Sequence, residues 1–363
     1  MNAPDKHDLA QPARRAFFEH AGGLGAAMAA VASGAAIASF PQDAAANTTG
    51  TQAKGGTSRF GKGPGIEGPY LDLRTGAGNQ LAYARIQGDI DWGKQKYFWF
   101  KGYIMGVEPQ KRIQNLLGAT GFGAIRLKQR PDGVIERLCR EIIVYTDLQS
   151  GEVIPEWKNP ISGETVKVLH VDNDPFNYLI ERFYPVPPSH RQLPGAPPPV
   201  RRPFVMPWYQ HGPTLAMETH IHLAFPNPLQ PDKWPRESAG PVAQVSEMFA
   251  HHIAVSDMQN PKLTSLEYAG VWNRITPWLP WMLMGQRPGM CQYACFMGGT
   301  RDLESVMDRR VLDYAEKNYR KYFEAPSAWT GQPSISSLEY YAKLQTPAPP
   351  LPAAAPAAPP TRP

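Results

Sequence analysis

Alternating apolar and polar positions in the middle of the chain predict β-strands. Residues 218–226, ETHIHLAFP, show this period of two most clearly. Side chains of a strand point alternately to its two faces. One face of this segment would carry Met217, Thr219, Ile221, Leu223 and Phe225. The other face would carry Glu218, His220 and His222, whose side chains bind metals, move protons or form hydrogen bonds.

Similar strand-length stretches follow one another from about residue 80, about ten in all. They include residues 81–89, LAYARIQGD, whereas residues 110–118, QKRIQNLLG, resemble one or two helical turns. The PDG turn at residues 131–133 joins two of the strands, as expected for a hairpin. No strand–helix–strand alternation points to a parallel sheet. Aromatic residues on both faces favour a closed antiparallel β-barrel over two packed sheets.

One long helix is predicted near the C-terminus, over residues 302–326. Asp302 is placed to cap it and Pro326 to end it, and apolar residues recur between them at helical spacing. We expect this helix to pack against the outside or one mouth of the barrel.

The two ends of the chain differ from its centre. Residues 1–46 contain Arg14 and Arg15, followed by a weakly apolar Ala/Gly-rich run, as in a twin-arginine export signal. A membrane anchor is the alternative, but the run is poor in large apolar residues. Residues 47–68 read as a flexible linker, 69–345 as a single β-barrel domain, and 346–363 as a disordered Pro/Ala tail. We therefore expect a periplasmic or secreted protein without a stable membrane span after signal removal.

The charge of the chain narrows the choice of partners. The formal net charge is +5, and Lys and Arg form no concentrated block. Nucleic-acid binding requires such a basic face and is not expected. The abundance of aromatic residues instead favours a small apolar or aromatic molecule as the partner.

Three phrases of the sequence carry a family resemblance. They are WKNPISGETVKVLHVDNDP (157–175), FPNPLQPDKWPRES (225–238) and PWLPWMLMGQRPG (277–289). Together they resemble the domain-of-unknown-function family 1838, whose members are often exported bacterial proteins. The resemblance implies a calycin-like antiparallel barrel. It implies no reaction and no catalytic residues.

The pair His220 and His222 has three interpretations. Two imidazoles on one strand face can bind a metal such as zinc, with Glu218 as ligand, partner or base. They can also serve acid–base catalysis without metal, or simply hold structural hydrogen bonds. A further ligand or catalytic group would come from His251 or His252, which point to opposite faces of the next strand.

Two other groups of residues are candidates for ligand contacts. His170 precedes Asp172 and Asp174 and would act as an oriented base, although an Asx-turn before a proline explains the two aspartates better. In residues 277–289, Trp278, Trp281 and Arg287 form either a ligand-closing lip or a plug of the barrel end.

Arg274 shares a strand face with Tyr268 and Trp272. A buried arginine needs a carboxylate partner, and the candidates are Glu218, Glu247 and Glu267. Arg274 and Arg287 are thus candidate anion clamps for a substrate.

Motifs for a serine nucleophile, a phosphate loop or a dinucleotide are absent from the sequence. The leading hypothesis is an exported enzyme that uses non-redox acid–base chemistry, as a lyase, isomerase or hydrolase, on a small apolar or aromatic molecule. Glu218, His220, His222, His251, His252 and Arg274 would be its catalytic residues. Tyr268, Trp272, Trp278, Trp281, Arg287 and His170 would contact the substrate. A non-catalytic lipocalin-like binding protein is the alternative, and a structural module of the cell envelope is a third possibility.

Overall fold

The computed structural model describes residues 62–184, 201–330 and 336–349. The predicted signal peptide, most of the predicted linker and most of the Pro/Ala tail lie outside these residues. Residues 62–68, which were predicted as linker, belong to the fold, because Ile66 is fully buried.

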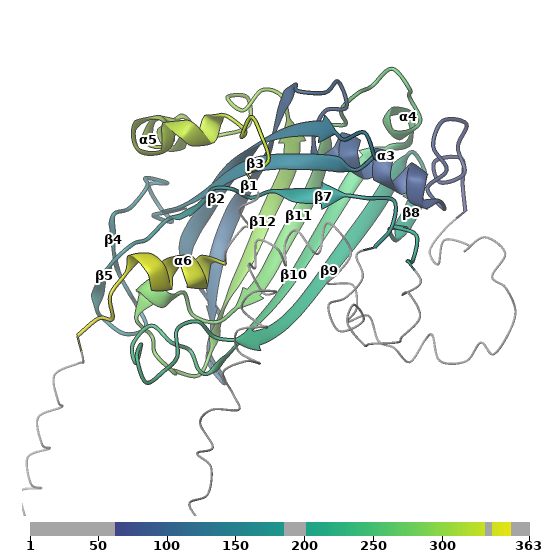
Figure 1. Cartoon of the computed structure of the whole chain (residues 1–363). Helices are drawn as coiled ribbons and strands as arrows, with labels where there is room; N and C mark the ends of the chain where they lie inside the picture. Colours follow the sequence, from purple (N-terminus) through teal and green to yellow (C-terminus); the bar gives the residue numbers. More distant parts are fainter. Residues whose placement is uncertain (1–61, 185–200, 331–335, 350–363) are drawn as a thin grey trace, which may run out of the picture.

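One large antiparallel sheet of ten strands dominates the molecule, which confirms the mainly β prediction. Its strand order is β6-β3-β2-β1-β12-β11-β10-β9-β8, and β7 also pairs with β3. The strands curl around a common interior (Figure 1). The long strands are β1 (Gln95–Val107), β2 (Gln114–Gln129), β3 (Ile135–Thr146), β9 (Thr214–Pro226), β10 (Val242–Ala254), β11 (Tyr268–Thr276) and β12 (Met290–Thr300). The short strands are β6 (Val171–Asn173), β7 (Tyr178–Ile180) and β8 (Trp208–His211).

The prediction of a closed barrel is wrong, because the described strands leave a seam between β7 and β8. Helix α3 (Gly76–Gln87) lies at this seam. The amide of Gln80 donates to the carbonyl of Ile180 in β7 at 2.9 Å. The side-chain oxygen of Asn79 accepts from the indole of Trp208 in β8 at 2.7 Å. The helix thus links the two sheet edges through its own side chains.

Two local predictions in this part of the chain are also wrong. Residues 81–89 are mostly helical rather than a strand, and β2 begins within the predicted helical turns of residues 110–118. Helix α3 is buried around most of its circumference, so its sequence lacks the one-sided apolar pattern that marks a surface helix.

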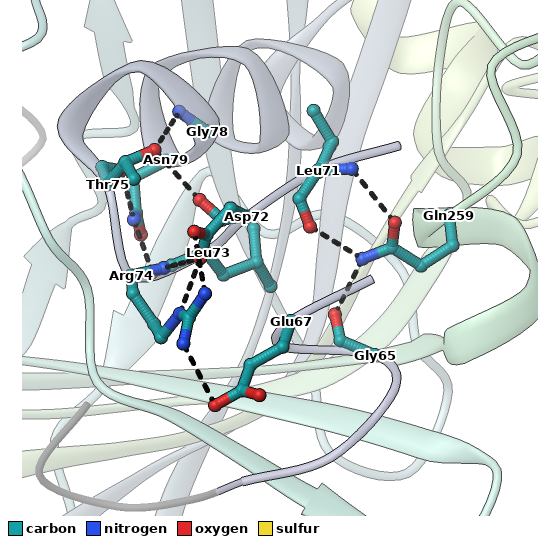
Figure 2. A network of polar contacts seen from close by, with 10 residues as sticks. All are labelled: Gly65, Glu67, Leu71, Asp72, Leu73, Arg74, Thr75, Gly78, Asn79 and Gln259. Atoms are coloured by element: carbon teal, nitrogen blue, oxygen red, sulfur yellow. Dashed lines mark hydrogen bonds and ion pairs between the residues drawn. The ribbon is translucent and has the colours of Figure 1, made fainter. Parts of the chain in front are cut away.

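A polar network holds the start of α3 in place (Figure 2). Thr75 caps the helix by accepting a hydrogen bond from the amide of Gly78 at 3.0 Å. Arg74 pairs with Asp72 and with Glu67. Gln259, which follows the short helix α4 (Val255–Met258), bonds both backbone groups of Leu71 at 2.9 Å.

The predicted C-terminal helix forms over a shorter range, as α5 (Arg309–Tyr319) followed by a 3-10 turn, η5 (Arg320–Phe323). Asp308, rather than Asp302, caps it by accepting from the amide of Arg310. The helix packs on the outer face of β2 and β3, where Phe122 and Val311 belong to one buried cluster. Its predicted place on the outside of the sheet is confirmed.

The other small elements gather at the end of the sheet opposite α3 (Figure 1). They are the hairpin of β4 (Glu156–Lys158) and β5 (Thr165–Lys167), the turn η4 (Pro280–Met282) and helix α6 (Ser337–Leu344). In the described residues no helix has both the length and the apolar character needed to cross a membrane.

Candidate functional site

The curled sheet encloses a cavity of about 470 Å³. Its walls come from the inner faces of β3 and β9 to β12, and from the segments around η4 and α6. Aromatic rings are prominent in the lining; they are contributed by Tyr145, Trp272, Trp278, Trp281 and Tyr293. Such a surface favours an apolar or aromatic ligand.

A buried ion pair lies in the cavity wall. Glu247 of β10 and Arg274 of β11 face each other in register, and the Glu247 Oε1 and Arg274 Nη1 atoms are 3.2 Å apart. Only 2% of the Glu247 side chain is exposed. The predicted carboxylate partner of Arg274 is therefore Glu247, one of the three candidates.

Glu141 of β3 is another carboxyl group of the cavity wall. It is 7% exposed, and burial raises its pKa to about 7 although Asn173, Arg137 and Arg274 favour its ionised form. Asn173 of β6 lies opposite in register, and its side-chain amide donates to Glu141 Oε2 at 2.5 Å. At neutral pH this carboxyl group thus exists in both protonation states.

Several polar atoms around the cavity have no hydrogen-bond partner among the described residues. They are Glu237 Oε2, Glu247 Oε2, Arg274 Nε and Trp272 Nε1. A buried polar atom without a partner is unfavourable, so these atoms retain the capacity to bond polar groups of a ligand or water.

Tyr145 and Tyr293 form a further polar contact, with hydroxyl oxygens 3.3 Å apart. Burial raises the pKa of Tyr145 to about 12, so its hydroxyl is protonated at pH 7. His170 accepts a hydrogen bond from the backbone amide of Tyr145 at 3.3 Å. Burial lowers the pKa of His170 to about 4, which keeps the ring neutral at pH 7.

A smaller chamber of about 100 Å³ lies next to the main cavity, and the two share Glu141, Phe176, Ile221 and Trp272 as lining residues. We call it the inner chamber. His251 lines it, and burial lowers the pKa of this histidine to about 3. Glu141 is thus part of the wall of both spaces.

Helix α6 contributes to the mouth of the main cavity. Tyr340 donates to Asp172 at 3.2 Å, and the Tyr341 ring lies 5.7 Å from that of Trp234. Both tyrosines line the cavity, whereas no residue of the helix is fully buried.

Many of the residues predicted from the sequence do line these spaces. The main cavity is lined by His170, Trp272, Arg274, Trp278 and Trp281, and the inner chamber by His251, Tyr268 and Trp272. Arg287 is the exception among the predicted substrate contacts. It lines neither space, and its Nε donates to Glu108 at 2.8 Å.

As catalytic residues, Glu218, His220 and His222 would have to face the cavity, and the structure places them on the other side of the sheet. They do share one strand face, and the His220 and His222 ring centroids are 6.3 Å apart, but it is the outer face of β9. The side chains of His220 and Glu218 are 35% and 46% exposed. Met217 and Ile221, on the opposite face, are buried, because turning the apolar set inward removes more apolar surface from water.

His252 also faces outward, as expected from its position next to the buried His251. His222 Nδ1 lies 2.9 Å from the hydroxyl of Ser246. Within the described ranges, no three His, Cys, Asp or Glu side chains form a group able to hold a metal ion. The predicted zinc site at His220 and His222 gains no support from this and stays a prediction, and we assign no step to a metal.

Replacing both outer histidines, in the variant His220→Ala/His222→Ala, is expected to change the free energy of unfolding by less than about 0.5 kcal/mol, as for exposed positions in general. Ile221→Ala, on the inner face of the same strand, is expected to destabilise by about 2–5 kcal/mol. Urea denaturation of the two variants measures both effects. A loss above 1.5 kcal/mol in the histidine variant, as an order-of-magnitude threshold, contradicts the outward placement.

Sequence reasoning missed Glu141, Asn173, Tyr145 and Tyr293. One signal for Glu141 was present: it is a single carboxylate within the apolar run EIIVY of a predicted strand. An acidic residue in such a run is almost never buried without a partner or a perturbed pKa.

Fold and site together define a mainly β protein whose curled antiparallel sheet holds an aromatic-lined cavity with buried carboxyl groups. The chain belongs to the DUF1838 family, described as "Protein of unknown function", because the family model matches residues 93–345. The resemblance seen in the sequence is thereby confirmed. Comparison with curated proteins found no match.

Proposed function

We propose that the protein is an acid–base enzyme for a small, largely apolar or aromatic molecule, and that Glu141 transfers the proton. The supporting observation is one carboxyl group with a pKa of about 7 in the wall of an aromatic-lined cavity. A general acid or base works best when its pKa lies near the working pH. Glu141 replaces the outward-facing His220 and His222 in this role.

The neighbouring groups suit the same chemistry. Arg274 Nε has no hydrogen-bond partner among the described residues, so it is available to hold a substrate oxygen that gains negative charge. The ion pair with Glu247 fixes the position of Arg274. Tyr145 is a protonated hydroxyl donor at pH 7. Proton abstraction next to a carbonyl group, as in lyases and isomerases, and hydrolysis are the reaction types that these groups support.

A lipocalin-like binding protein without catalysis is the second candidate. It is favoured by the hydrogen bond from Asn173 to Glu141, which gives this carboxyl group a structural partner. Both proposals need a ligand in the cavity and accord with a calycin-like fold, which the family resemblance implies. The third possibility, a structural module, gains no support from an aromatic-lined cavity of about 470 Å³. We retain export through the twin-arginine route to the periplasm as part of the proposal.

Untargeted mass spectrometry tests the enzymatic proposal. Wild-type protein and Glu141→Gln are each incubated with a bacterial small-molecule extract at pH 7. We expect wild type to deplete particular compounds and form new ones, and Glu141→Gln to bind the same compounds with at least about a hundredfold slower conversion, since general acid–base catalysis contributes about 10²–10⁴-fold.

A different outcome favours the second candidate. If both proteins retain the same compounds and neither converts them, the protein is a carrier. If Glu141→Gln converts the compounds as fast as wild type, Glu141 is not the proton-transferring group.

A further inference from the structure

The inner chamber contains a buried cation without an acidic partner. Arg137 of β3 is 2% exposed and lines this chamber. Among the described residues, no carboxylate lies within ion-pair distance of its guanidinium group. Glu141, four residues further along the same face of β3, acts on this charge only from beyond ion-pair distance. Taking a guanidinium group out of water is unfavourable, and an anion bound directly beside it would offset part of this cost.

Arg137 makes few contacts through the edge of its guanidinium group. Its one hydrogen bond to a described backbone group runs from Nη1 to the carbonyl of Phe176 at 3.1 Å. Its Nε has no partner among the described residues. Three rings surround the group, those of Phe98, Phe176 and Tyr178, with the last at 4.5 Å. Aromatic rings interact with the faces of a guanidinium ion and leave its edge for planar acceptors such as carboxylates.

Two other buried cations of the fold are compensated by hydrogen bonds to backbone carbonyl groups. Arg85 donates to the carbonyls of Asp257, Met258, Asn260 and Leu263 through Nε, Nη1 and Nη2. Lys96 donates to three carbonyls. Both cations are held by backbone groups and line neither the cavity nor the inner chamber. Arg137 differs because its Nε donor has no partner among the described residues and because the inner chamber lies beside it.

A second donor is available in the same chamber. His251 Nδ1 is buried and has no hydrogen-bond partner among the described residues. Its ring lines the chamber together with Thr219 and Arg137. In the tautomer protonated at Nδ1, the neutral ring is a further hydrogen-bond donor of the chamber wall.

We propose that the inner chamber binds the carboxylate of the ligand against Arg137, and that the ligand class is therefore apolar or aromatic monocarboxylic acids. The chamber of about 100 Å³ holds a carboxylate and a short piece of chain, and the apolar body extends past Trp272 and Ile221 into the main cavity. Glu141, which borders both spaces, then faces the carbon skeleton rather than the acid group. This inference rests on the proposed role of the cavity as the ligand site.

Two matched pairs of probes test it at pH 7: octanoate with octan-1-ol, and 3-phenylpropionate with 3-phenylpropan-1-ol. Binding is followed by titration calorimetry and by the fluorescence of the tryptophans that line the cavity. We expect wild type to bind each acid at least about tenfold more tightly than its alcohol, because a hydrogen bond to a charged group contributes about 1.5–3 kcal/mol.

Variants test whether Arg137 causes the preference for the acid over the alcohol. Arg137→Met should bind acid and alcohol with affinities within about threefold of each other, whereas Arg137→Lys should keep part of the preference. Arg309→Ala, which breaks exposed ion pairs on α5, should keep the preference in full. Binding is measured without turnover, which separates this inference from the proposed proton transfer. Thermal unfolding checks that the variants are folded, and if Arg137→Met does not fold, wild type and Arg137→Lys decide.

Equal affinity for acid and alcohol in wild type, or an undiminished preference in Arg137→Met, overturns the acid-binding inference while leaving the cavity as a ligand site. Absence of binding for all four probes also overturns it. The extract experiment then decides separately whether the protein is an enzyme.

Discussion

Replacing Arg274 by alanine should destabilise the protein by about 3 kcal/mol or more at pH 7, because removing one partner of a buried ion pair leaves the other charge uncompensated. The remaining partner, Glu247, has a side chain that is 2% exposed. Its pKa is raised by burial even while Arg274 is present, so the loss should become smaller at pH 5, where Glu247 takes up a proton more readily.

Two controls separate this effect from a general loss of contacts. The double variant Glu247→Gln/Arg274→Met removes both charges at similar volume and should recover most of the stability. Arg309→Ala breaks exposed ion pairs on α5 and should change the free energy of unfolding by less than about 0.5 kcal/mol. Urea denaturation at both pH values provides the data. A loss below about 1 kcal/mol in Arg274→Ala contradicts the buried pair.

The second large effect concerns the dependence of stability on pH. The pKa of Glu141 is raised from 4.5 to about 7 in the fold, so the native state binds this proton more tightly than the unfolded state. The stabilisation is present below pH 4.5 and is lost as the pH rises through about 7. The loss amounts to about 3 kcal/mol between these limits, since one pKa unit corresponds to about 1.36 kcal/mol.

Only the difference in the free energy of unfolding between wild type and Glu141→Gln isolates the contribution of this carboxyl group. The lowered pKa values of His170 and His251 act in the opposite direction, because the unfolded state binds their protons more tightly. We therefore expect the stability of Glu141→Gln, relative to wild type, to increase by about 3 kcal/mol between pH 4.5 and pH 8. Chemical denaturation across this range measures the stability difference between the two proteins. A difference that stays constant with pH rules out a raised pKa of Glu141.

The strands and their faces were predictable because residue alternation follows directly from backbone geometry. Which face becomes the interior was not settled by Glu218, His220 and His222 themselves. A single curled sheet has one inner face, and the apolar set with Ile221 occupies it. The same rule would have predicted the exposed histidines if both faces had been compared for apolar surface.

The link between the two edges of the open sheet depends on contacts between residues far apart in the sequence. Asn79 and Gln80 of α3 bond to β8 and β7, more than 90 residues away in each case. No local pattern carries this information. The sequence offered Glu247 as one of three candidate partners of Arg274, and the pairing of β10 with β11 selects it. Asn173, which bonds Glu141, comes from a short strand and was visible only in three dimensions.

The most direct test of the account is the pKa of Glu141 itself. Infrared difference spectroscopy of wild type against Glu141→Gln, recorded over a pH titration, isolates the carbonyl band of this one protonated carboxyl group. We expect the band to disappear with a midpoint near pH 7. A midpoint below about pH 5, the ordinary range of an exposed glutamate, would contradict the proposed proton-transferring role.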